Sequence, residues 1–210
     1  MTMPSTTHPT DQPSRRRADA ERSIAAIIDA GLDCFSSNPD ATMTAVARAA
    51  GVGRVTLYAH FPSREALLEA VLAHAFAQAD AALDSEALDQ EPAPRALARL
   101  IQSSWRILDR HRSLLVAATR TLGPSRLRDY HARVLGRVER LVASGQREGA
   151  FRTDLPRGWL VATFYSLMHA AAEEVDAGRL APSAAGDVLH ATLLAALAAP
   201  PVSAGGSRRR

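Results

Sequence analysis

The chain of 210 residues contains one cysteine and no lysine. Cys34 therefore has no intrachain disulfide partner, and cysteine ligands for a metal ion are missing. Aromatic residues make up only 5% of the chain, and alternating β-branched runs that would predict strands are absent. The longest apolar stretches, 160–172 and 189–202, are shorter than the roughly 20 residues of a membrane span. Residues 1–14 also lack the apolar segment of a secretory signal. We expect a soluble, cytoplasmic protein without a metal or cofactor.

Hydrophobic residues make up 47% of the chain, which is enough for a sizeable core, and alanine and leucine dominate the long segments. Both are strong helix formers, so the composition predicts an all-α fold. The formal net charge of +3 is compatible with nucleic-acid binding and equally with simple solubility. Because lysine is absent, any phosphate contact must come from arginine, a neutral donor or the backbone.

Apolar periodicity and helix breakers divide the chain into two domains. Residues 15–62 form the first, and residues 63–199 form a helical bundle, with a connection at 83–94. Residues 1–14 and 200–210 are expected to be disordered tails. Arg15–Arg17 is a candidate DNA-contacting arm, although a solvated charge run is the more ordinary interpretation. Helices are expected at 18–37, 43–50, 54–60, from Ser63 onward, 95–111, 113–121, 125–145, 157–177 and 182–199.

Residues 42–61 have the spacing of a helix-turn-helix. Thr42 is a natural N-cap of the first helix, and Gly51 suits the left-handed position that ends it. In the second helix Leu57 is expected to point inward, as is Phe61 just after it. The residues left on the outer face are Arg54, Val55, Thr56, Tyr58 and Ala59. The N-terminal part of such a helix enters the major groove of DNA.

This segment resembles the signature of TetR-family regulators, with the pattern Thr42-x-x-x-Val46-Ala47-x-x-Ala50-Gly51-Val52-Gly53-x-x-x-Leu57-Tyr58-x-His60-Phe61-x-Ser63-Arg64-Glu65-x-Leu67. The resemblance implies an N-terminal three-helix DNA-binding domain and a helical domain for effector binding and dimerisation. It implies base contacts by Arg54, Val55 and Thr56. It implies phosphate contacts by Thr42, Thr44, Tyr58, His60 and Arg64.

Two residues depart from the family pattern. Gly53 stands where serine is common, which weakens the cap of the second helix. Arg64 stands where lysine is usual; since it is also a cation, its phosphate contact is expected to survive.

No motif indicates an enzyme. Gly51-Val52-Gly53 begins like a dinucleotide-binding loop but lacks a preceding strand and a third glycine. No nucleophile elbow, Walker loop or zinc-binding histidine pair is present. His169 has only Glu173 at helical spacing, and one such pair does not make a metal site.

The last two predicted helices carry more apolar residues than a one-sided surface helix needs, which predicts a homodimer built through them. The alternative is that this excess is buried monomer core. Large or polar residues on apolar helices are candidates for a pocket that takes a hydrophobic or aromatic effector. They are Trp105, Tyr130, Trp159, Phe164, Tyr165, Met168 and His169.

Together these features favour a repressor that a small molecule releases from a palindromic operator in double-stranded DNA. Two alternatives remain. One is an architectural DNA-binding protein without an effector, and the other is a helical ligand-binding bundle with a degenerate helix-turn-helix. Operator position, which the chain does not encode, decides between repressor and activator.

Overall fold

The computed structural model describes residues 12–84 and 91–200, and the described residues are helical apart from turns and one isolated β-bridge. The all-α prediction is therefore confirmed. The chain divides into two compact units. The first comprises residues up to Ala75 together with Ser113–Gly123, and the second comprises Phe76–Arg112 and the residues from Pro124 onward.

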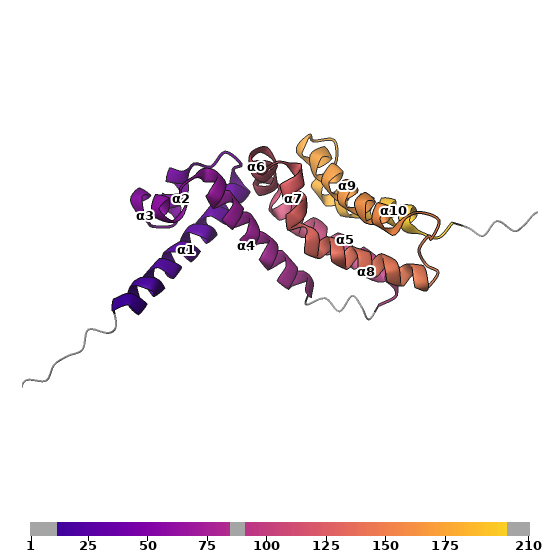
Figure 1. Ribbon diagram of the computed structural model, residues 1–210. Coiled ribbons are helices and arrows are strands. Elements are labelled where there is room, and N and C mark those ends of the chain that lie inside the picture. Colours follow the sequence, from indigo (N-terminus) through magenta and orange to yellow (C-terminus); the bar gives the residue numbers. More distant parts are fainter. Residues whose placement is uncertain (1–11, 85–90, 201–210) are drawn as a thin grey trace, which may run out of the picture. The chain divides into compact units, whose positions relative to one another are not determined.

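The first unit contains the helix-turn-helix (Figure 1). Its elements are α1 (Gln12–Ser37), α2 (Met43–Ala49), α3 (Arg54–His60), the first half of α4 (Arg64–Asp84) and nearly all of α6 (Arg112–Leu122). The core of this unit consists of fully buried side chains from α1 to α4, namely Ile27, Phe35, Val46, Leu57, Leu67, Leu68, Val71 and Leu72. Leu114 and Ala118 of α6 are also completely buried.

Two local features set the geometry of the helix-turn-helix. Thr42 Oγ1 accepts a hydrogen bond from the Ala45 backbone N–H at 3.2 Å and so caps α2. Gly51 adopts φ +67°, a left-handed conformation that glycine tolerates best. Its N–H donates to Arg48 O, and the N–H of Val52 donates to Ala47 O, which completes a Schellman motif. Both predictions from the sequence are confirmed.

Helix α4 is long and apolar enough to cross a membrane by length and composition over Arg64–Leu83. Its N-terminal half, however, supplies the completely buried Leu67, Leu68, Val71 and Leu72 to the core of the first unit. Arg64, Glu65 and Glu69 lie on the same half. We therefore describe α4 as a core helix.

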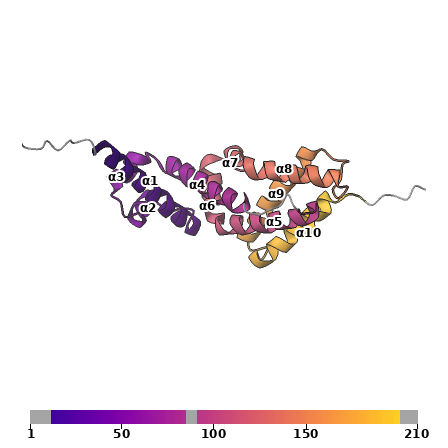
Figure 2. The ribbon, with the colours of Figure 1, turned by 90° about the horizontal axis from the view of Figure 1, so that it is seen from below.

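The second unit is a helical bundle of α5 (Ala93–Arg110), α7 (Pro124–Tyr130), α8 (Ala132–Arg147), α9 (Arg157–Asp176) and α10 (Pro182–Leu197). Helix α5 packs along α10 and α8, and α9 packs against α8 and α10 (Figure 2). The C-terminal end of α10 is held by a short antiparallel bridge, in which the Arg152 N–H donates to Leu197 O and the Ala199 N–H donates to Ala150 O.

Three expectations about the boundaries need correction. Residues 12–14 of the predicted disordered tail are helical. Pro13 is tolerated there because it lies in the first turn of α1, where no intrahelical N–H is required. Residues 1–11 and 201–210 of the two predicted tails lie outside the described residues. The first unit also extends beyond the expected 15–62, to Ala75 and to the segment 113–123.

The third correction concerns the single helix expected at 125–145, which is broken at His131. The His131 ring nitrogen Nδ1 lies 2.9 Å from Leu127 O, the carbonyl that a continuous helix would offer to the His131 backbone. The backbone N–H donates instead to Arg128 O at 3.0 Å. The side chain therefore competes with the helix for its own acceptor.

Candidate nucleic-acid interface

Helix α3 presents the outer face that its sequence predicts. Leu57 is completely buried, whereas Val55 is 85% exposed and Tyr58 42% exposed. Arg54 and Thr56 are exposed beside them. A thymine methyl is the apolar partner that a major groove offers to an exposed valine at this position.

Arg54 and Thr56 are placed in the first turn of α3, where residues of a recognition helix meet base edges. No side chain caps this helix, because Gly53 occupies its N-cap position. The first N–H groups of α3 are therefore left for another acceptor. Gly53 thus leaves α3 without the side-chain cap that a serine at this position would offer.

The predicted phosphate-contacting residues differ in how available they are. Thr42 and Thr44 are exposed at the start of α2. Thr42 uses its oxygen as an acceptor for the Ala45 N–H and keeps its own O–H for donation. His60 is half-buried at the end of α3.

The guanidinium of Arg64, for which a phosphate contact is predicted, is engaged in hydrogen bonds within the first unit. Nη2 donates to Pro39 O at 2.6 Å, Nε to Ala41 O at 3.4 Å and Nη1 to Thr121 Oγ1 at 3.2 Å. The guanidinium carbon also lies 5.2 Å from the centre of the Phe35 ring. A phosphate contact by this side chain would require these bonds to break.

The predicted effector residues fall into three groups. Phe164 and Met168 of α9 are buried, at 3% and 4% exposure. Trp105 is also buried, and its Cδ1 lies 3.5 Å from the position of a Cβ on Gly186 of α10. Trp159 is 63% exposed near the start of α9. In the single chain most of the Trp159 side chain is therefore open to solvent.

Tyr130, Tyr165 and His169 come together with two residues that the sequence analysis missed. We call this set, Phe76, Tyr130, His131, Tyr165 and His169, the ring cluster. Ring centres lie 5.8 Å apart for Phe76 and Tyr130, 4.6 Å for Phe76 and His131, 5.1 Å for His131 and Tyr165, and 4.4 Å for Tyr165 and His169. The four-residue spacing of Tyr165 and His169 was a usable signal, but nothing local indicated Phe76.

The ring cluster is electrically neutral at its centre. Burial lowers the pKa of His131 to about 4, and burial likewise lowers the pKa of His169. Burial raises the pKa of Tyr165. The His169 Nε2 atom is buried without a hydrogen-bond partner, and the Arg128 guanidinium lies 4.6 Å over the Tyr165 ring. This arrangement has one cation at its edge and an unsatisfied polar atom inside.

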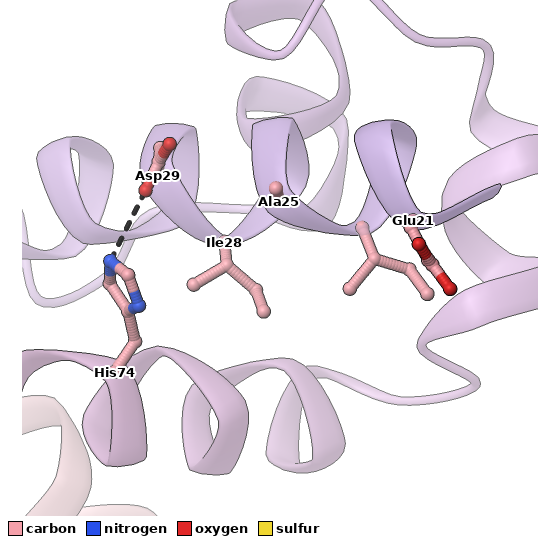
Figure 3. A pocket seen from close by; sticks show the side chains of 6 residues that line it. Glu21, Ala25, Ile28, Asp29 and His74 are labelled. Atoms are coloured by element: carbon pink, nitrogen blue, oxygen red, sulfur yellow. Dashed lines mark ion pairs between the residues drawn. The ribbon is translucent and has the colours of Figure 1, made fainter. Parts of the chain in front are cut away.

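A separate groove of about 310 Å³ lies between α1 and α4 in the first unit (Figure 3). The two helices approach closely at Gly31, where a Cβ would lie 2.7 Å from Val71 Cγ2. Ile24, Ala25 and Ile28 line the groove, with Glu21 on α1 beyond them and His74 bonded to Asp29 at 3.2 Å. None of the predicted site residues lines this groove.

Comparison with known proteins matches the helix-turn-helix to a family. Residues 27–71 match the model of bacterial regulatory proteins of the tetR family. The chain is also 30% identical over 168 residues to the HTH-type transcriptional repressor LfrR of Mycolicibacterium smegmatis, covering 79% of this chain and 86% of that protein. The chain belongs to the TetR family. It is accordingly a DNA-binding transcriptional regulator.

A second sequence relative and two solved structures are also similar to this chain. The HTH-type regulator TtgW of Pseudomonas putida is 45% identical over 58 residues, or 27% of this chain and 43% of that protein. The crystal structure of LfrR from Mycobacterium smegmatis with proflavine superposes with a TM-score of 0.63 at 26% identity, covering 82% of this chain and 94% of that one. FadR of Bacillus subtilis, solved with stearoyl-CoA, gives a TM-score of 0.67 at 16% identity, covering 81% and 97%. The named repressor LfrR and its structure with proflavine fit a ligand-responsive repressor.

Proposed function

We propose that two copies of this chain bind a palindromic operator as a repressor, each placing α3 in the major groove. The exposed face of Arg54, Val55, Thr56 and Tyr58 carries this proposal, because it combines a bidentate donor, an apolar contact and a hydroxyl at the start of one helix. Arginine reads guanine, and valine or threonine contacts the thymine methyl. A regulator of this type meets its operator in the cytoplasm.

We further propose that α9 and α10 form the dimer interface. Among the described residues, the exposed large hydrophobic side chains are Val55 and Tyr58 on α3 and Trp159 and Val188 on α9 and α10. Exposed tryptophan is typical of protein interfaces, where burial of its ring contributes strongly to affinity. We therefore propose that Trp159 contributes to the dimer interface and does not contact the effector.

The ring cluster is the proposed effector site. Neutral imidazoles and tyrosines provide stacking surfaces, and the unpartnered Nε2 of His169 provides one polar contact that a bound molecule could satisfy. These features favour a flat hydrophobic or aromatic effector. Binding must favour a state with weaker operator affinity, because a ligand with equal affinity for both states shifts nothing.

The experiment has two stages. The full chain is first used to enrich duplexes from a random pool, and the enriched sequences are checked for two inverted half-sites about one helical turn apart. Effector response is then measured as fluorescence anisotropy of the labelled duplex, with proflavine and stearoyl-CoA as initial probes.

Enrichment of a palindrome and release by an aromatic probe would support the proposal. Enrichment of many unrelated duplexes, together with no release of the protein from DNA by any hydrophobic compound, would favour an architectural protein instead. No enrichment at all would refute the proposed DNA interface. Tyr165→Ala is the matched variant for the effector site, and it should lower probe affinity while leaving operator affinity unchanged.

A further inference from the structure

Arg64 holds together two segments of the first unit that are far apart in the sequence. Its Nη2 and Nε atoms donate to the carbonyls of Pro39 and Ala41, in the turn that immediately precedes the Thr42 cap of α2. Its Nη1 atom donates to the hydroxyl of Thr121, near the C-terminal end of α6. The rigid fork of a guanidinium can reach several acceptors in this way, whereas a lysine ammonium offers one charged point.

The surroundings of Arg64 fix its direction. Ala41 is buried at 7% exposure, and the Arg64 guanidinium lies over the fully buried Phe35 ring. A second link between the same segments, from Arg120 Nη2 to Asp40 Oδ1 at 3.2 Å, joins two side chains that are both more than 60% exposed. An exposed ion pair contributes little. The half-buried bonds of Arg64 are therefore the stronger connection.

Helix α6 has an unusual place in the chain. Residues 113–123 belong to the first unit, but the segments on both sides of them, ending at Arg112 and beginning at Pro124, belong to the second. Helix α7 begins three residues after Thr121 and carries Arg128 and Tyr130, which lie at the ring cluster. The backbone of α7 thus continues directly from the segment that carries Thr121, whose hydroxyl accepts from Arg64.

We propose that Arg64 is a positioning residue, which sets the placement of α2 and α3 on the operator according to the position of α6, and that its side chain does not bind phosphate. This inference rests on the proposed DNA interface. It predicts that a residue of α6, which contributes nothing to the DNA-reading face, nevertheless alters operator affinity.

The salt dependence of operator binding separates the two roles of Arg64. Each lost phosphate contact lowers the slope of log K against log salt by about 0.9, hence by about 1.8 for the two protomers of a dimer. We expect Arg64→Ala to weaken binding with an unchanged slope. Arg64→Lys restores the charge but not the fork, so it should bind as weakly as the alanine variant.

Thr121→Val removes the hydroxyl that accepts from Arg64 while preserving the shape of the side chain. We expect about a three- to tenfold loss of operator affinity for each protomer of the dimer, the size of one lost hydrogen bond. Thr119→Val is the matched control, because the Thr119 hydroxyl donates to Leu115 O within α6 and is exposed. It should bind as the wild type does.

These measurements use the full chain and the duplex enriched by the wild type, and melting temperature is recorded for every variant. A loss of about 1.8 in slope for Arg64→Ala, with rescue by lysine, would show a phosphate ligand and overturn the proposal. Wild-type affinity in a Thr121→Val variant would also overturn it, whether or not its melting temperature falls. If Arg64→Ala does not fold, the lysine and valine variants still decide. A wild type that enriches no duplex would instead refute the DNA interface itself.

Discussion

Truncation of Val55 to alanine should separate DNA binding from folding. Because Val55 is 85% exposed in the free chain, removal of its two methyl groups should change the free energy of unfolding by no more than about 0.5 kcal/mol. In the proposed operator complex the same methyl groups become buried against a base edge. Burial of each contributes about 0.8 kcal/mol, so complete burial in both protomers gives about 3 kcal/mol, or roughly a two-hundredfold loss of affinity as an upper value.

Leu57→Ala is the matched contrast on the same helix. Leu57 is completely buried, and truncation of such a side chain costs about 2–5 kcal/mol of stability. Urea unfolding followed by circular dichroism gives the stability, and anisotropy of the enriched duplex gives the affinity. A Val55→Ala protein that binds with wild-type affinity and unaltered base preference would refute the placement of the outer face of α3 in a groove.

Other predictions concern packing, titration and assembly. Gly145→Ala should destabilise the second unit by about 1–3 kcal/mol in urea unfolding, because the new Cβ would lie 2.1 Å from Cδ2 of the buried Phe151. Gly51→Ala should cost about 1–2 kcal/mol through its φ of +67° alone, since nothing lies within 4 Å of the added atom. The pKa of His131 is about 4 in the folded chain against about 6.5 when unfolded. The unfolded chain therefore takes up the proton first, and stability should fall by up to about 3 kcal/mol between pH 6.5 and 4; unfolding of a His131→Gln variant should lack this share of the pH dependence. Trp159→Ser should shift the protein toward monomers in sedimentation, with little loss of helix content in circular dichroism.

The DNA-reading helices could be predicted from the sequence because their determinants are local. The Thr42 cap, the left-handed Gly51 and the inward Leu57 act within a few residues of their own position. Each follows from a propensity or a periodicity that needs no knowledge of the rest of the chain. The exposure of the outer face of α3 then follows from the burial of its inner face.

Features that depend on distant partners escaped prediction. The break at His131 arises because its ring takes the Leu127 carbonyl, and histidine within a helical pattern gives no sign of that choice. The intrachain hydrogen bonds of Arg64 escaped prediction for a related reason. A cation at a family position indicates a phosphate contact only while its donors remain free, and the competing acceptors Pro39 O, Ala41 O and Thr121 Oγ1 lie 23 to 57 residues away.

The proposed operator face depends on residues that are close in the sequence, whereas the ring cluster depends on residues that are far apart. The operator face uses consecutive helices, so a substitution at Val55 or Thr56 can alter base preference without disturbing a distant contact. The ring cluster draws Phe76, His131 and Tyr165 from separate segments of the chain, and each ring touches at least one other. If the ring cluster is the effector site as proposed, a change of effector preference requires coordinated substitutions, because removal of one ring leaves its neighbours without their packing partner. Double-mutant cycles test this consequence. For probe affinity, the free-energy effects of Phe76→Leu and Tyr165→Leu should not add. For operator affinity measured without probe, the effect of either substitution should add to the effect of Val55→Ala.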